Sequence, residues 1–169
     1  LAQGLEERGA KFILQSAGSP SITLALTQPD RDIPDYAYLH MTFQAELRKV
    51  LKPETVLMGS AYSVFRNGKN KFMAVEPEEK TFLYWANKNI TDGVCDMVAV
   101  GRQSLADPGM PAKLEACKPD QVQWCTLCDN CLEFLIRQEP VGCAVYQPEY
   151  TRRLQEIRKE KGRITEKHT

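Results

Sequence analysis

Residues 96–108 read Asp-Met-Val-Ala-Val-Gly-Arg-Gln-Ser-Leu-Ala-Asp-Pro, and this stretch decides the fold class. Its first half is a short apolar run, which is typical of a buried β-strand. Gly101 and Arg102 follow at the carboxyl end of that strand, where parallel α/β folds bind their ligands. A glycine lets the backbone approach an anion, and an arginine offers a planar fork that suits phosphate. Ordinary turn chemistry and a surface ion pair are the alternative explanation.

The chain before this stretch alternates between strand and helix patterns. Apolar runs predict strands over residues 11–17 and 55–60, and periodic apolar residues predict helices over 35–51 and 77–89. The connections are long enough for crossover helices, so the sheet is expected to be parallel. We also expect a helix tail ending at Gly9, an extended loop over 20–34, a short helix capped by Asp107 and a C-terminal helix over 150–161.

Composition excludes several classes of protein. Among 169 residues, 22 are Lys or Arg and 22 are Asp or Glu, and 43% are apolar. This is the composition of a globular domain, without the single-sign field that holds nucleic acid or an anionic membrane. We also find no apolar run near the ~20 residues of a membrane span. The length is short of the ~250 residues of a complete (β/α)8 barrel. The chain starts at Leu1 and shows no signal-peptide pattern. The missing start methionine, with only three βα units before the cysteine run, predicts a fragment.

Four of the six cysteines lie close together, in the pattern Cys125-x2-Cys128-x2-Cys131-x11-Cys143. Three closely spaced thiols and one remote thiol favour a [4Fe–4S] cluster over zinc, which more often takes paired Cys-x2-Cys knuckles. A disulfide scaffold is disfavoured, because the first 94 residues contain no cysteine. Zinc and disulfides remain alternatives. Of the other two cysteines, Cys95 is expected to be a small buried residue, and Cys117 either buried or an exposed thiol.

Residues 96–108 resemble the last barrel strand of the Old Yellow Enzyme-like family of NADH:flavin oxidoreductases, whose pattern is an aspartate, an apolar run, Gly-Arg, two residues and Leu-Ala-Asp-Pro. The cysteine run falls where the iron–sulfur branch of that family, which includes 2,4-dienoyl-CoA reductase and trimethylamine dehydrogenase, has its cluster. The resemblance implies strands 6–8 of a (β/α)8 TIM barrel, followed by a cluster loop and a C-terminal helix. The implied boundaries are a partial barrel over 1–118, a cysteine segment over 119–147, and a helix and tail over 148–169.

The resemblance also implies cofactor sites. Gly59, Ser60 and Ala61 would contact the FMN phosphate, Gly101 and Arg102 would complete that site, and Gln103 would lie near the flavin ring edge. Cys125, Cys128, Cys131 and Cys143 would ligate the [4Fe–4S] cluster. Trp124 directly precedes the first of them and is expected to shield the cluster from water, with a packed core residue as the alternative. The family usually has Gly-Gly where this chain has Gly59-Ser60, which changes one contact. FMN, the cluster or both could be absent from an isolated fragment.

The implied function is reduction of an activated C=C bond, with NAD(P)H as the electron donor of the full enzyme. An amine dehydrogenase or demethylase of the same family, with electrons flowing the other way, is the alternative within the family. A non-catalytic zinc-binding α/β module is the alternative outside it. No catalytic residue can be named, and Tyr36, Tyr38 and His40 are better explained as helix-face residues. The expected partners are a small-molecule substrate and either the rest of the barrel or a second copy of the chain. We expect neither nucleic acid nor membrane as a partner, and a cytoplasmic location.

Overall fold

Three short parallel strands form the sheet. The computed structural model describes residues 1–16, 36–65 and 81–166. In this part of the chain, β1 (Phe12–Leu14), β2 (Val56–Gly59) and β3 (Met97–Val98) are hydrogen-bonded in the order β1-β2-β3. Both pairs are parallel, with Phe12 opposite Val56 and Met58 opposite Met97. The prediction of an α/β fold with a parallel sheet is therefore confirmed, although each strand is shorter than predicted. The described strands do not form a closed barrel.

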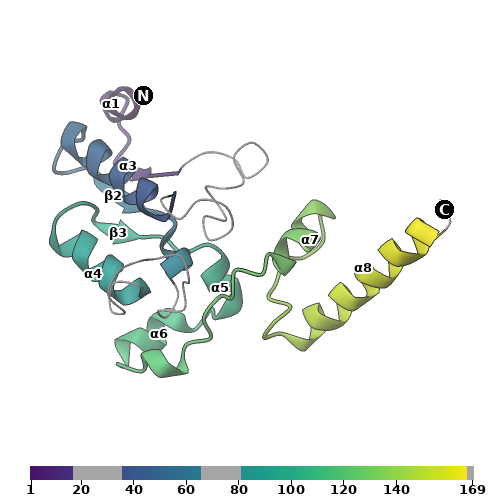
Figure 1. Ribbon diagram of the computed structural model, residues 1–169. Coiled ribbons are helices and arrows are strands. Elements are labelled where there is room, and N and C mark those ends of the chain that lie inside the picture. The colour runs from purple at the N-terminus through teal and green to yellow at the C-terminus, as the bar shows by residue number, and fades with distance from the viewer. Residues whose placement is uncertain (17–35, 66–80, 167–169) are drawn as a thin grey trace. The chain divides into compact units, whose positions relative to one another are not determined.

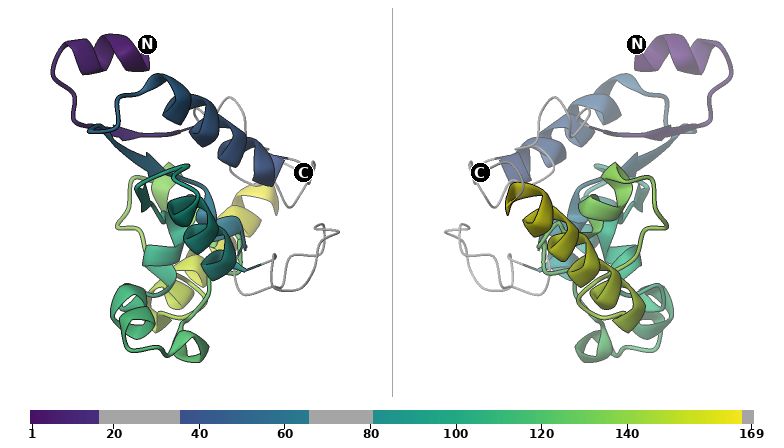
Figure 2. Two further views of the ribbon diagram at one scale, coloured as in Figure 1. Left: turned by 90° about the vertical axis from the view of Figure 1, so that its left-hand side faces the viewer. Right: turned by 90° about the vertical axis from the view of Figure 1, so that its right-hand side faces the viewer.

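Helices lie between successive strands, as the sequence predicts. The structure has α1 (Ala2–Glu7), α3 (Tyr36–Val50), the 3-10 turn η1 (Tyr62–Phe65) and α4 (Phe82–Thr91). Helix α3 connects β1 to β2 and contacts β2, whereas α4 precedes β3 and contacts it (Figures 1 and 2). Gly9 and Gly93 follow α1 and α4 with positive φ angles of 96° and 68°, which confirms both as helix stops. The predicted loop over 20–34 and the predicted helix start at Pro77 lie outside the described residues.

The two faces of the sheet differ in burial. The register places Leu57 and Gly59 on one face, where both are buried and Gly59 packs against Gln44 of α3. The opposite face carries Phe12, Leu14, Val56, Met58 and Met97. On that face Phe12 is 69% exposed, Leu14 56% and Met97 47%. Parallel sheets are normally covered on both faces, so this apolar face lacks its cover within the part of the chain that is described.

Asp96, the residue just before β3, binds both α3 and β2. Asp96 Oδ2 accepts the N–H of Leu57 in β2 at 2.7 Å and pairs with the guanidinium of Arg48 in α3 at 3.0 Å. Arg48 also donates to the carbonyl of Thr55, at 3.2 Å, just before β2. Asp96 therefore fixes where α3, β2 and β3 meet.

The chain divides into two compact units, Leu1–Gly101 and Arg102–Thr169. The second unit contains α5 (Arg102–Ala106), α6 (Met110–Glu115), the 3-10 turn η3 (Pro119–Gln121), α7 (Asn130–Ile136) and α8 (Pro148–Glu166). Its apolar core consists of Phe134, Ala144, Leu154 and Ile157, with Val141 and Tyr150 packed against it. The predicted boundaries after residues 118 and 147 stay predictions. Within the described residues, no helix is long and apolar enough to cross a membrane.

Three features of the second unit differ from the expectation. Helix α8 begins at Pro148, two residues before Tyr150, and continues to Glu166. Its earlier start fits the preference of proline for the first helical position and of an acidic residue, here Glu149, for the first turn. Helix α7 occupies part of the cysteine segment, which was expected to be a loop. Asp107 does not cap α6 directly: the cap position is Gly109, whose N–H donates to Asp107 Oδ1 at 3.1 Å.

We expect Asp96→Ala to destabilise the first unit by about 1–3 kcal/mol, because it leaves the Leu57 N–H without its carboxylate acceptor. Asp92→Ala is the matched control, since it removes only the exposed Lys88–Asp92 pair and should cost about 0.3–0.5 kcal/mol. Urea unfolding followed by circular dichroism measures both. Equal losses in the two variants would contradict this role of Asp96.

Candidate functional site

The loop after β2, where the FMN phosphate is predicted, is held by buried glutamines. Gln15, which follows β1, is 2% exposed, and its Oε1 accepts the backbone N–H of Ser60 at 3.4 Å and the Ser60 hydroxyl at 3.2 Å. Gln44 of α3 donates to the Ser60 carbonyl and to Gln15 Oε1, each at 3.2 Å. Both donors of Ser60 are thus engaged by Gln15. To bind a phosphate they would have to leave that acceptor.

The residues on either side of Ser60 have restricted backbones. A Cβ atom on Gly59 would overlap the Gln44 carboxamide and come within 3.0 Å of the Tyr62 ring. Ala61 has a φ of 74°, in the left-handed region that is unfavourable for residues with a side chain. The close packing of Gln44 therefore explains why a glycine stands at position 59, independently of any cofactor.

The same hydrogen-bond network continues into the core of the first unit. Gln15 Nε2 lies 3.3 Å from Nδ1 of His40, and the Tyr62 hydroxyl donates to Gln44 Oε1 at 2.7 Å. Cys95 is buried as predicted, with its sulfur 3.4 Å from the Tyr62 oxygen. Burial is the main cause that raises the pKa of Tyr62 and of Cys95 above their ordinary values. His40 is thus a buried network residue, and Cys95 lies in a different unit from the cysteine run.

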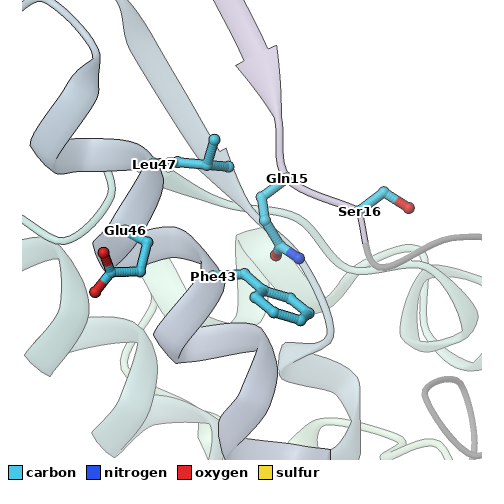
Figure 3. Close-up of a pocket in the computed structure, with 5 residues that line it drawn as sticks. All are labelled: Gln15, Ser16, Phe43, Glu46 and Leu47. Atoms are coloured by element: carbon cyan, nitrogen blue, oxygen red, sulfur yellow. The ribbon is translucent and has the colours of Figure 1, made fainter. Parts of the chain in front are cut away.

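A pocket of about 440 Å³ opens at the carboxyl end of β1. Figure 3 shows the Gln15 amide directed toward α3, beside the ring of Phe43. The described lining residues are Gln15, Ser16, Phe43, Glu46 and Leu47. They include one carboxylate and no basic side chain, so they do not favour an anionic group.

The predicted residues Arg102 and Gln103 open α5 in the second unit, whereas Gly59, Ser60, Ala61 and Gly101 belong to the first. The guanidinium of Arg102 pairs with the carboxylate of Asp129. Gln103 is 1% exposed and accepts the N–H of Cys125 at 2.8 Å. The predicted place of Gln103 near a flavin edge stays a prediction. In the structure, its side chain bonds the cysteine segment.

The four predicted cluster ligands all lie in the second unit, but they differ in exposure. Cys125 is buried, Cys131 and Cys143 are half-buried, and Cys128 is exposed. Cys131 lies in the first turn of α7, while the other three lie outside helices. Cys117 is exposed and has a φ of 55°. The predicted shielding by Trp124 has no test in the structure.

The thiols influence one another electrostatically. Burial is the main cause that raises the pKa of Cys125, and the neighbouring thiols of Cys128 and Cys143 raise it further. The N–H of Leu127, 3.5 Å from the Cys125 sulfur, and the charge of Arg102 oppose this rise. The pKa of Cys131 is likewise raised, mainly by burial. Iron or zinc would displace the protons that these thiols carry in the metal-free chain.

The donor set fits an iron–sulfur cluster in kind. It offers four thiols, a backbone N–H directed at one sulfur and a neighbouring cation. Across the described ranges, no three His, Cys, Asp or Glu side chains converge closely enough to bind a single metal ion. The thiolates of a four-iron cluster bind different irons, so such convergence is not a requirement for a cluster.

Comparison with known proteins gives short matches to reductases. The chain is 33% identical over 57 residues to a metal reductase of Desulforamulus reducens, which covers 33% of this chain and 8% of that protein. It is 35% identical over 57 residues to a bilirubin reductase of Mediterraneibacter gnavus, covering 33% of this chain and 9% of that protein. Each match therefore spans less than a tenth of the relative. No family profile matches the chain.

One solved structure also resembles the chain. It is 6-hydroxypseudooxynicotine amine oxidase from Pseudomonas geniculata N1, with a TM-score of 0.45 and 21% identity, and the similarity covers 62% of this chain and 13% of that one.

Sequence reasoning missed Asp107 as an anchor of the cysteine segment. Its Oδ2 accepts the N–H of Gln123 at 2.9 Å and binds Lys113 Nζ at 2.6 Å. Burial opposes ionisation of Asp107, but the hydrogen bonds from Lys113, Gln123 and Gly109 hold its pKa below the ordinary value. The available signal was the four-residue spacing of Gln103 and Asp107. Residues four apart lie on the same side of a helical turn, so both side chains could be expected to bond the same neighbouring segment.

We expect Gly59→Ala to cost about 1–3 kcal/mol of stability, because the added methyl group overpacks against Gln44 and Tyr62. Gly4→Ala is the control, since nothing lies within 4 Å of its added methyl group. Thermal unfolding of the two variants measures the difference. A Gly59→Ala variant as stable as the wild-type chain would refute the packing argument.

Asp107→Asn should destabilise the second unit by about 1–3 kcal/mol at neutral pH, because it loses the charged acceptor of Gln123 and Lys113. The folded pKa of Asp107 lies below its unfolded value, so its contribution is complete above about pH 4 and is lost as pH falls through the folded pKa. Urea unfolding of the wild-type chain and of Asp107→Asn should therefore give free energies of unfolding that differ at neutral pH and converge in acid. The exposed Asp120→Asn is the control, and a difference independent of pH would rule out the carboxylate as the cause.

Proposed function

We propose that this chain is the C-terminal part of the barrel of an FMN- and [4Fe–4S]-dependent oxidoreductase that reduces an activated C=C bond. The observation that carries the proposal is the set of four thiols in one unit, which begins at Arg102, a few residues after β3. Their sequence spacing is typical of an iron–sulfur ligand set, and the donor set fits it in kind.

The sheet supports the barrel part of the proposal. Three parallel strands in chain order, with helices between them, are the repeating unit of a (β/α)8 barrel. The apolar face formed by Phe12, Leu14, Val56, Met58 and Met97 would then be the lining of the barrel interior. Further βα units of a longer polypeptide are the partner that would cover it, because they also pair with the open strand edges.

The names of the two matched relatives support the redox part. Both are reductases, which favours the reductive direction over amine dehydrogenation. NAD(P)H as electron donor and a small molecule with an activated double bond as substrate belong to this proposal.

The chain's own residues would bind and tune the cofactors. When bound, the cluster supplies single-electron transfer and FMN supplies hydride transfer. Cys125, Cys128, Cys131 and Cys143 would hold the cluster, with the Arg102 cation offsetting part of the thiolate charge. The FMN phosphate would be held by Gly59–Ala61, Gly101 and Arg102. The Ser60 N–H and hydroxyl would then donate to the phosphate in place of Gln15 Oε1.

Anaerobic reconstitution of the chain with ferrous iron and sulfide tests the proposal. We expect about four irons and four sulfides per chain, and a broad visible absorption that bleaches on reduction. Single alanine variants at Cys125, Cys128, Cys131 and Cys143 should lose most of this absorption. Cys117→Ala is the matched control, because Cys117 is an exposed thiol outside the set, and it should retain full absorption.

Other outcomes separate the alternatives. A colourless chain that binds one zinc per molecule would favour the zinc-binding module. Loss of free thiols in air, with no uptake of either metal under reducing conditions, would favour disulfides. Either result would refute the cluster, and therefore the proposed function.

A further inference from the structure

Two glutamine side chains hold the first and last cysteines of the set in the same way. Gln103 in α5 accepts the N–H of Cys125 at 2.8 Å through Oε1 and donates to the carbonyl of Gln123 at 3.0 Å through Nε2. Gln147 accepts the N–H of Cys143 at 2.7 Å and donates to the carbonyl of Leu105 at 3.3 Å. Since the partners are backbone groups of fixed polarity, each carboxamide has one orientation that satisfies both.

Both contacts lead to the same helix. Gln103 lies in α5, and Leu105, which Gln147 bonds, is also an α5 residue. The N–H and carbonyl of Gln123, the carbonyl of Trp124 and the N–H of Cys125 are all bonded by side chains. These partners come from Asp107, Gln103 and Tyr146, so the segment is fixed without belonging to a helix or sheet.

The remaining two cysteines are held differently. The Cys128 side chain is exposed and lies between Leu127 and Asp129, whose φ angles are 52° and 57°. Cys131 lies in the first turn of α7, where its position follows the packing of that helix.

We propose that Gln103 and Gln147 are positioning residues that fix Cys125 and Cys143 on α5 before a cluster binds, leaving Cys128 and Cys131 to close on it. This inference rests on the proposed function. Ordering two of four ligands in advance lowers the conformational entropy lost when the cluster binds. It also divides the ligands into a preformed pair and a closing pair, which the spacing alone does not distinguish.

Gln103→Met and Gln147→Met test the proposal, because methionine keeps the length of the side chain and removes both hydrogen bonds. After anaerobic reconstitution with ferrous iron and sulfide, we expect each variant to lose its cluster to a chelator about ten- to a hundredfold faster than the wild-type chain. Gln155→Met on the exposed side of α8 is the matched control and should behave as wild type. Circular dichroism of the metal-free proteins checks that each variant is folded.

Hydrogen exchange of the metal-free chain gives an independent readout. The amides of Cys125 and Cys143 should be protected in the wild type, and each variant should lose protection at the cysteine that its glutamine holds. Gln147→Glu retains the acceptor and should keep the Cys143 amide protected. Because Gln147 is half-buried, its variants are informative even if Gln103→Met does not fold.

The outcomes separate the two proposals. A wild-type chain that takes up no cluster refutes the proposed function, and amide protection then decides the positioning role alone. If the wild type takes up a cluster and both methionine variants lose it to the chelator at a rate within twofold of the wild-type rate, the positioning role is refuted and the proposed function stands. Unprotected Cys125 and Cys143 amides in the metal-free wild type also refute the positioning role.

Discussion

Buried and half-buried side-chain amides hold the loops of both units. A carboxamide is tolerated in a core only when its oxygen and its nitrogen both find partners, so each buried glutamine fixes two groups at once. In the first unit, Gln15 and Gln44 hold the backbone of Ser60 after β2. In the second, Gln103 and Gln147 hold the amides of two cysteines. The positions that the family resemblance assigns to phosphate and cluster binding are thus the positions that these amides restrain.

The sequence predicted the elements that carry a periodic or compositional signal. Apolar runs located all three strands, and Gly9 and Gly93 located two helix ends, because a left-handed φ strongly favours glycine. The buried glutamines could not be predicted in this way. A polar residue becomes buried only because of distant backbone groups that it bonds, and those partners have no local signature. Helix α7 was missed for a related reason: its turn is stabilised by Phe134 packing on α8, a tertiary contact.

One face of the sheet in the first unit leaves large apolar side chains exposed. Leu57 of β2, the strand that α3 contacts, is fully buried, yet Phe12 and Leu14 are largely exposed on the other face of the sheet. Large apolar side chains in register on adjacent parallel strands are expected to be buried, since exposing them forfeits about 25 cal/mol for each Å² that a cover would remove from water. This face carries Phe12, Leu14, Val56, Met58 and Met97 and no charged residue among them, which is typical of a sheet face that is buried against other elements.

The cysteine segment shows how an irregular backbone can prepare a site. Two of the four cysteines have their own amide held by a glutamine, Cys125 by Gln103 and Cys143 by Gln147. Cys131 has no such contact within the described residues and takes its position from α7, whose Phe134 packs into the core. Cys128 has no such restraint of its own. Its neighbour Asp129, however, pairs with Arg102 of α5, so both ends of the loop that carries Cys128 are anchored to that helix. A ligand set built in this way needs only the loop that carries Cys128 and the first turn of α7 to adjust when a cluster binds. The restraints on Cys125 and Cys143, more than the spacing of the cysteines, would therefore set how readily a cluster binds.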